Sequence, residues 1–296
     1  MKIQAPSKII DAHNHPDWHG HNFERFICNM DEHGIEKTWL LSWECPVDEY
    51  NQSSNSSLPS CLSGEKDNGP IPFSRCLAYH DRAPERFVLG YAPDPRRPDG
   101  LDRLKAAVEI YGVRVCGELK LRMMFDNRDA VRMYRFCGEN DIPVTIHLDY
   151  EQDRDSSYPR PNYWYGGGID AFERALKECP ETVFLGHAPG FWAHISNDDQ
   201  YNKVSYPEGE VIPGGKLPRL LREYSNLCCD LSAGSGRNAL QRDPDFALEF
   251  IDEFQDRLLF ARDCFDGRLH EFLSGLNLPG ETAEKILYKN AESLTT

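Results

Sequence analysis

Eight short apolar runs with the composition of β-strands recur along the chain, and a longer amphipathic segment follows each of them. Alternation of strand and helix predicts an α/β fold with a parallel sheet, and eight repeats predict a closed (β/α)8 barrel of the TIM type. A doubly wound open sheet is the alternative, but no GxGxxG motif follows the first run. The runs cover residues 8–13, 38–43, 87–92, 113–121, 143–149, 182–188, 226–232 and 257–263.

The length of the chain indicates one domain with long loops. A barrel takes about 250 residues, so we expect residues 1–296 to form a single, distorted barrel domain. Long irregular segments at 51–70, 150–168 and 189–215 follow the second, fifth and sixth runs. They would rise from the carboxyl-end face, where Trp164 and Trp192 are candidates for substrate binding. The alternative is that these aromatic residues pack on each other or on a neighbouring subunit.

The composition excludes several classes of protein. A net charge of −15 argues against an extended nucleic-acid-binding surface, because phosphate contacts need clustered lysine and arginine. No stretch reaches the roughly 18 apolar residues of a membrane span, and the amino terminus lacks a signal pattern. We therefore expect a cytoplasmic protein whose partner is a small molecule. In that reducing compartment the ten cysteines are expected to be mostly buried free thiols.

Ligand-type side chains gather at the carboxyl ends of five predicted strands. His13 and His15 are two residues apart, so on a strand both imidazoles point the same way. Nitrogen and carboxylate ligands without sulfur predict one or two divalent metal ions, with zinc expected and manganese, iron or nickel as alternatives. The candidate ligands are His13, His15, Glu118, His147, His187 and Asp263.

These motifs resemble those of the amidohydrolase superfamily. "DAHNH" is similar to its first-strand signature, "TIHLD" and "LGHAPG" to its histidine-bearing fifth and sixth strands, and "LLFARD" to its last strand with an aspartate. The closing "KILYKNAESL" also resembles the family's last helix. The resemblance implies a metal-bearing barrel in which His13, His15, His147 and Asp263 are ligands.

"CGELKL" is similar to a fourth-strand segment in the metal-dependent deoxyribonuclease branch and in some dihydroorotase-like members. That resemblance implies that Glu118 is a ligand or a bridge between two ions. With two ions, His147 and His187 would serve the second one; with one ion, His187 would be free for catalysis.

The implied activity is metal-dependent hydrolysis of an amide, lactone or ester of a small molecule. Asp263 would exchange the proton of a metal-activated water, and His187 would stabilise the developing oxyanion or orient the water.

A branch that resembles aminocarboxymuconate-semialdehyde decarboxylase implies an alternative, a decarboxylase or hydratase of an unsaturated carboxylic acid. Lys120 and Arg122 could then bind a substrate carboxylate, or could form ion pairs with acidic neighbours. A barrel that binds a ligand without turnover is the third alternative. Related barrels often pair, so a homodimer remains an open alternative. The last strand departs from the family pattern because Arg262 precedes Asp263, where the family usually has serine.

Overall fold

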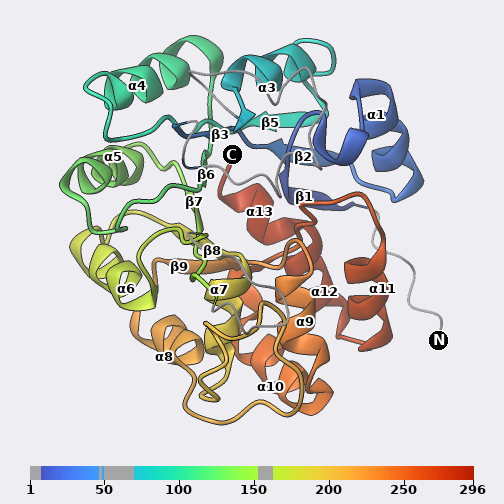
Figure 1. Ribbon diagram of the computed structural model, residues 1–296. Coiled ribbons are helices and arrows are strands. Elements are labelled where there is room, and N and C mark those ends of the chain that lie inside the picture. Colours follow the sequence, from blue (N-terminus) through green and yellow to red (C-terminus); the bar gives the residue numbers. More distant parts are fainter. Residues whose placement is uncertain (1–7, 47–48, 50–69, 153–162) are drawn as a thin grey trace.

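The computed structural model describes residues 8–46, 49, 70–152 and 163–296, and its strands lie together at the centre of a ring of helices (Figure 1). The predicted loop at 51–70 falls outside these residues except for Pro70. Residues 153–162 of the second long segment, including Tyr158, also fall outside them.

The eight barrel strands follow the predicted order, and hydrogen-bonded neighbours among them are parallel. One group has the order β1-β2-β5 and the other has the order β10-β9-β8-β7-β6. The strands are β1 (Ile10–Asn14), β2 (Lys37–Leu40), β5 (Phe87–Leu89), β6 (Cys116–Leu119), β7 (Val144–His147), β8 (Phe184–His187), β9 (Leu227–Asp230) and β10 (Leu258–Leu259).

Backbone hydrogen bonds join the two groups of strands at both seams. Between β5 and β6, the Tyr91 amide donates to the Val115 carbonyl at 2.9 Å. Between β1 and β10, the Ala12 amide donates to the Phe260 carbonyl at 2.9 Å. The predicted (β/α)8 barrel is therefore confirmed.

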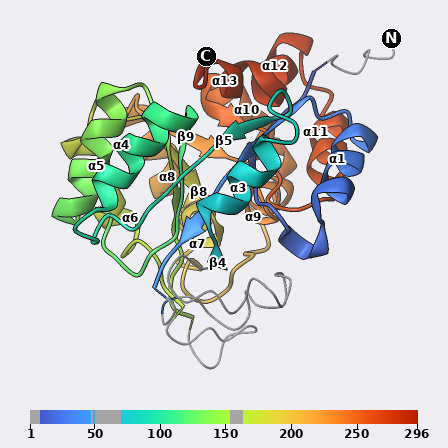
Figure 2. The same cartoon turned by 90° about the horizontal axis from the view of Figure 1, so that it is seen from above.

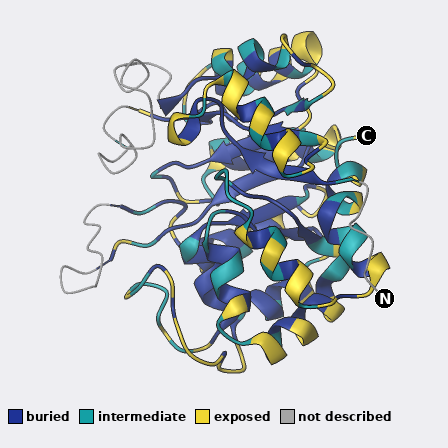
Figure 3. Cartoon of the chain, turned by 90° about the vertical axis from the view of Figure 1, so that its right-hand side faces the viewer, coloured by how far each residue is buried: buried dark blue, intermediate teal, exposed yellow. Residues whose placement is uncertain are grey.

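Helices surround the strands and turn their exposed residues outward (Figure 3). The longer helices agree with the predicted amphipathic segments: α1 (Phe23–Glu32), α3 (Phe73–His80), α4 (Gly100–Tyr111), α5 (Arg128–Glu139), α6 (Ile169–Glu178), α8 (Lys216–Glu223) and α10 (Pro244–Phe254). Near the carboxyl terminus lie α11 (Arg268–Gly275), α12 (Gly280–Glu284), a π-helix (Lys285–Lys289) and α13 (Asn290–Ser293).

Short elements fill the connections. They are the antiparallel pair β3 (Trp43–Glu44) and β4 (Pro70–Ile71), α7 (Pro189–Trp192), α9 (Ser235–Gln241) and the 3-10 turns Trp18–Gly20, Ala193–Ile195 and Gln255–Arg257. The glycine-rich sequence "LSAGSG" (231–236) predicts a plain turn, but in the structure its last two residues begin α9. No helix within the described ranges is long and apolar enough to cross a membrane.

The two ends of the barrel have different covers. In Figure 2, α12 and α13 lie at one end, and α7 and β4 lie at the other. Ala291 of α13 is buried with Ile10, Trp39 and Leu185, which fill the barrel interior. Helices α12 and α13 close this end of the barrel. The functional side chains are therefore expected at the opposite end, where the strands have their carboxyl ends.

A register irregularity in β1 turns His13 inward. Ile10 and Ala12 pack in the barrel interior, so strict alternation would point His13 outward. The pairing of β1 with β2 shifts between Asp11 and Asn14, and a shift of this kind re-aims the following side chains.

The nine described cysteines are free thiols, and seven of them are buried. Burial raises the pKa of Cys45 and of Cys228 to about 12. These thiols pack as small apolar side chains, as the sequence predicts.

A buried ion pair ties the first strand to the last. Arg262 is 2% exposed, and its Nε donates to Asp11 Oδ2 at 2.9 Å while its backbone amide donates to Asp11 Oδ1 at 2.8 Å. Arg262 Nη1 also donates to Asn29 Oδ1 on α1 at 2.9 Å. The residue that departs from the family pattern therefore fixes the seam of the barrel.

We expect Arg262→Ala to lower the free energy of unfolding by about 3–5 kcal/mol, because it leaves the Asp11 carboxylate buried without its cation. Denaturant unfolding measures the change. The control is Arg135→Ala, which removes an exposed partner of Glu178 and should cost less than about 1 kcal/mol. Equal losses in the two variants would contradict a special role for the seam.

Candidate metal centre

The carboxyl ends of the strands bring the predicted ligands together. Two sets of three side chains place one ligand atom each within 4.8 Å of one another, and the sets share His13. The first set is His13, Glu118 and His187, and the second is His13, His15 and Asp263. Five of the six predicted ligands thus converge in these two sets.

The imidazoles of His13 on β1 and of His15, just past the end of β1, face each other through their Nε2 atoms, which are 3.3 Å apart. His13 Nδ1 lies 2.6 Å from Asp230 Oδ2, and His15 Nδ1 lies 2.8 Å from the Leu41 carbonyl. A carbonyl and an ionised carboxylate only accept, so each Nδ1 carries the hydrogen and a neutral ring presents a lone pair at Nε2. Two lone pairs aimed at one point are the arrangement that a cation requires.

The two oxygens of Glu118 face different histidines. Oε2 lies 3.4 Å from His15 Nε2 and 3.9 Å from His13 Nε2. Oε1 lies 2.5 Å from His147 Nδ1 and 3.5 Å from His187 Nε2. This carboxylate therefore faces all four histidines of the centre.

His147, the sixth predicted ligand, belongs to neither set of three. Its Nδ1 faces Glu118, and its Nε2 lies 3.0 Å from Asp149 Oδ2. Asp149 Oδ1 accepts from the Gly190 amide of α7 at 3.3 Å. If Nε2 carries the hydrogen for Asp149, Nδ1 is the atom that remains for an ion.

Sequence reasoning missed Asp230, the last residue of β9. One of its oxygens accepts from His13 Nδ1, and the other lies 3.4 Å from His187 Nδ1. Ser232 Oγ lies 2.7 Å from the same His187 nitrogen. Asp230 thus orients two candidate ligands through their Nδ1 atoms, on the side of each ring opposite to Nε2. The rule that found Asp263, an acidic residue at a strand end, would also have found Asp230.

Asp263 has an unusual backbone at the edge of the site. Its φ is +49°, a left-handed conformation that aspartate and asparagine adopt more readily than most residues. Its amide donates to the His13 carbonyl at 2.8 Å, and its carbonyl accepts from Trp18 Nε1 at 3.0 Å. Its Oδ1 is buried without a hydrogen-bond partner among the described residues and lies 3.6 Å from His15 Nε2.

Charge pairing decides the ionisation of the buried carboxylates. Burial opposes ionisation of Glu118, but His147, His15 and Lys120 outweigh it and hold its pKa well below the usual range. Burial also opposes ionisation of Asp230, and His187 and His13 lower its pKa in the same way. Both groups are therefore anions at neutral pH.

The pKa of His13 shifts the other way. Burial lowers it, but the Asp230 carboxylate outweighs this effect and raises it above its usual value. A cation at Nε2 would compete with the proton for the same lone pair.

Lys120, predicted to bind substrate, is buried among aromatic rings beside the centre. Its Nζ lies 4.3 Å from the ring centroid of Trp43, 5.4 Å from that of Tyr165 and 5.8 Å from that of Tyr163. Tyr165 also meets the His147 ring edge to face, with centroids 5.5 Å apart. One aromatic ring therefore contacts both Lys120 and a candidate ligand.

Arg122 lies on the same loop and is half-buried. Its backbone amide donates to Glu49 Oε2 at 2.9 Å, and the Tyr165 hydroxyl donates to the Glu49 carbonyl at 3.1 Å. The other Glu49 oxygen accepts from Arg96 at 2.6 Å. Arg122 Nε is buried and has no hydrogen-bond partner within the described part of the chain.

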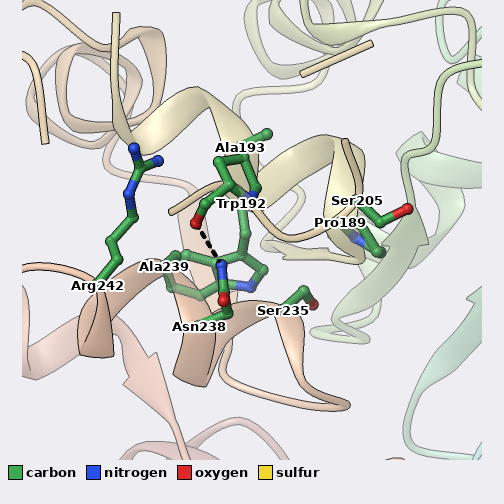
Figure 4. Close-up of a pocket in the computed structure, with 9 residues that line it drawn as sticks. Pro189, Trp192, Ala193, Ser205, Ser235, Asn238, Ala239 and Arg242 are labelled. Carbon is green, nitrogen blue, oxygen red and sulfur yellow. Dashed lines mark hydrogen bonds between the residues drawn. The ribbon is translucent and has the colours of Figure 1, made fainter. Parts of the chain in front are cut away.

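The two tryptophans predicted to bind substrate differ in their surroundings. Trp164 is half-buried and stands between Tyr163 and Tyr165 in the chain. Trp192 is 1% exposed, and its Nε1 donates to the Asp230 carbonyl at 2.9 Å. It also lines a small hollow with Asn238, which donates to the Pro207 carbonyl at 3.0 Å (Figure 4). A role of either tryptophan in substrate binding stays a prediction.

The residues present fit a divalent metal ion. The facing Nε2 atoms of His13 and His15, the unpartnered oxygen of Asp263 and the nitrogen and oxygen donors without sulfur match the preferences of zinc, manganese and related ions.

Comparison with protein families agrees with this chemistry. The model of the Amidohydrolase family (Amidohydro_2) matches residues 72–294, more than half of the chain. The chain belongs to this amidohydrolase family. The matched residues begin after β1, so His13 and His15 of this amidohydrolase lie outside the match. The fold of the chain places them at the metal centre. A search of curated proteins gives no match.

Solved structures with the same fold cover almost the whole amidohydrolase chain. An uncharacterised TIM-barrel protein from Bordetella bronchiseptica is 17% identical (TM-score 0.61; 97% of this chain and 98% of that one). A putative 2-pyrone-4,6-dicarboxylic acid hydrolase from Pseudomonas putida is 14% identical (TM-score 0.61; 98% and 97%). A dihydroxybenzoic acid decarboxylase from Polaromonas sp. JS666, solved with bound manganese, is 15% identical (TM-score 0.59; 98% and 97%).

We expect Asp230→Asn to weaken binding of a divalent metal by about 10- to 100-fold, because the amide no longer fixes the orientation of His13 and His187. Competition with a chromophoric chelator measures the affinity. Asp170→Asn, which changes an exposed aspartate on α6, is the control and should bind metal like the wild type. An unchanged affinity of Asp230→Asn would contradict the assigned role.

Proposed function

We propose that this amidohydrolase is a metal-dependent hydrolase that cleaves an amide, lactone or ester bond of a small molecule. The observation that carries the proposal is the pair of facing Nε2 atoms of His13 and His15, 3.3 Å apart, each with its Nδ1 held by an acceptor. Such a pair is unfavourable for two neutral imidazoles unless a cation lies between them.

The two oxygens of Glu118 lie near different pairs of histidines, which supports a site for two ions. His13, His15, Asp263 and one Glu118 oxygen would hold the first ion. The other Glu118 oxygen, His147 and His187 would hold the second. Zinc is the metal we propose, with manganese, iron and nickel as alternatives, and the bound manganese of one structural neighbour supports testing that ion first among them.

A bound divalent cation would supply an acidified water and a polarised substrate oxygen. Asp263 would accept the proton of the attacking water at the carboxylate oxygen that does not hold an ion, and would return it to the leaving nitrogen or oxygen. If it is not a ligand, His187 would donate to the oxyanion from Nε2 in the tautomer whose Nδ1 accepts from Ser232 Oγ. The carbonyl carbon gains the hydroxyl and the leaving atom gains the proton.

A decarboxylase or hydratase of an unsaturated carboxylic acid is the second candidate function. The buried ammonium of Lys120 beside the centre favours it, because such a substrate brings its own carboxylate. A decarboxylase and a putative pyrone dicarboxylate hydrolase are both among the structural neighbours, by the names printed for them. Labelled carbon dioxide from a dihydroxybenzoate would support this candidate, and acid release without carbon dioxide from a lactone would support the first.

We expect Asp263→Asn to lower turnover by about 10²- to 10⁴-fold, because the amide cannot accept a proton. Asparagine tolerates the left-handed backbone, so the fold should persist. The control Asp266→Asn changes a nearby aspartate that pairs with Arg268 and should leave turnover unchanged. Steady-state rates are measured on metal-loaded enzyme, and an Asp263→Asn variant with wild-type turnover would overturn the mechanism.

We expect the purified protein to contain about one to two equivalents of transition metal, since the centre offers ligands for one ion or two. Elemental analysis measures the content. Removal with a chelator should abolish turnover, and metal should restore it. Full turnover in metal-free protein would sink the proposed function.

A further inference from the structure

Two of the candidate ligands lie beyond the ends of their strands. His15 follows Asn14, the last residue of β1, and Asp263 lies past Leu259, the last residue of β10. The other candidates belong to β1, β6, β7 and β8. Regular strand pairing therefore does not fix these two residues, and other contacts have to set the 3.6 Å between His15 Nε2 and Asp263 Oδ1.

The buried side chain of Trp18 contacts both of them. Its Nε1 donates to the Asp263 carbonyl at 3.0 Å, and its ring meets the His15 imidazole edge to face, with centroids 5.3 Å apart. Because the indole is buried, water competes little for its hydrogen bond. One indole thus links the two candidate ligands that lie outside the strands.

The contact with Trp18 has a specific consequence for Asp263, whose backbone is left-handed with a φ of +49°. A residue other than glycine keeps this conformation where its surroundings hold it. Two such contacts come from the segment that carries the paired histidines. The His13 carbonyl accepts from the Asp263 amide at 2.8 Å, and Trp18 donates to the Asp263 carbonyl. Without the indole N–H one of these contacts is lost, and the carboxylate is held less firmly relative to His15.

Helix α3 holds the turn that presents Trp18. The preceding residue, Asp17, is buried and has a φ of +59°. Its amide donates to the Tyr79 hydroxyl at 3.1 Å, and this hydroxyl donates to Asp17 Oδ1 at 2.9 Å. Asp17 Oδ2 accepts from Arg75 Nε at 2.7 Å. These bonds fix the main chain next to Trp18, so α3 determines where the indole points.

We propose that Trp18 is a positioning residue of the metal centre, which sets His15 against Asp263 and is itself held in place by α3 through Asp17. This role rests on the proposed function, because it takes a metal ion to be bound between the two side chains. Trp18 acts through the ligands and not on the substrate. Its loss should therefore change both the affinity for the ion and the arrangement of the ligands around it.

Cobalt(II) provides the test, because its visible absorption depends on the arrangement of its ligands and its affinity can be measured against a chelator. Trp18→Phe keeps a ring beside His15 but loses the N–H donor. We expect it to bind cobalt about ten-fold more weakly than the wild type and to show a shifted visible spectrum at saturation. Trp18→Leu, which also loses the ring, should bind cobalt more weakly still.

Trp39→Phe is the matched control. It makes the same change at a buried indole of the barrel interior, whose Nε1 has no hydrogen-bond partner among the described residues. We expect this variant to bind cobalt like the wild type and with the same spectrum. Because a folded, cobalt-saturated protein that is merely less stable keeps the wild-type spectrum, the spectrum separates positioning from stability.

Wild-type affinity or a wild-type spectrum in Trp18→Phe overturns the inference and leaves the proposed function standing, as does an equal loss in Trp39→Phe. A wild-type protein that binds no cobalt overturns the proposed function as well. If Trp18→Phe does not fold, Tyr79→Phe takes its place, since it removes the hydroxyl that holds Asp17 and leaves the indole intact. It should also weaken cobalt binding and shift the spectrum, and wild-type values would overturn the inference.

Discussion

The carboxylate of Asp230 holds two imidazoles at once, and the geometry of the centre depends on it. One oxygen fixes His13 and the other faces His187, so the Nε2 atoms of both rings point toward Glu118. His187 and His13 in turn keep the pKa of Asp230 low in its fully buried position. The ligands and their support therefore stabilise one another, and neither would keep its orientation alone.

Much of the barrel could be predicted because its strands are buried and apolar and its helices are amphipathic. Strand ends in a barrel meet at one face, so His13, His187 and Asp263 could be brought together without knowing any side-chain conformation. The inward turn of His13 could not be predicted, since it depends on a register shift against β2. The short helix α9 was not predicted, because the glycine-rich start of its sequence is typical of a turn and it holds few apolar residues.

Roles that depend on hydrogen-bond partners were harder to predict than ligand identity. The resemblance implied His147 as a ligand and left His187 either as a ligand or free for catalysis, and only the structure shows that Asp149 holds one ring and that Ser232 and Asp230 hold the other. Arg262 marked a departure from the family pattern, and only the fold shows that it neutralises Asp11 at the seam. Long-range pairs of this kind join residues that are distant in sequence, so no local pattern reveals them.

The left-handed backbone of Asp263 restricts how this position can change during evolution. Few side chains other than those of glycine, asparagine and aspartate accept a φ of +49° at low cost. Of these three, only aspartate is an anion. A replacement by glutamate would keep the charge but meet backbone strain, so conformation and electrostatics select the same amino acid independently, and descendants of this protein have little room to move the negative charge elsewhere.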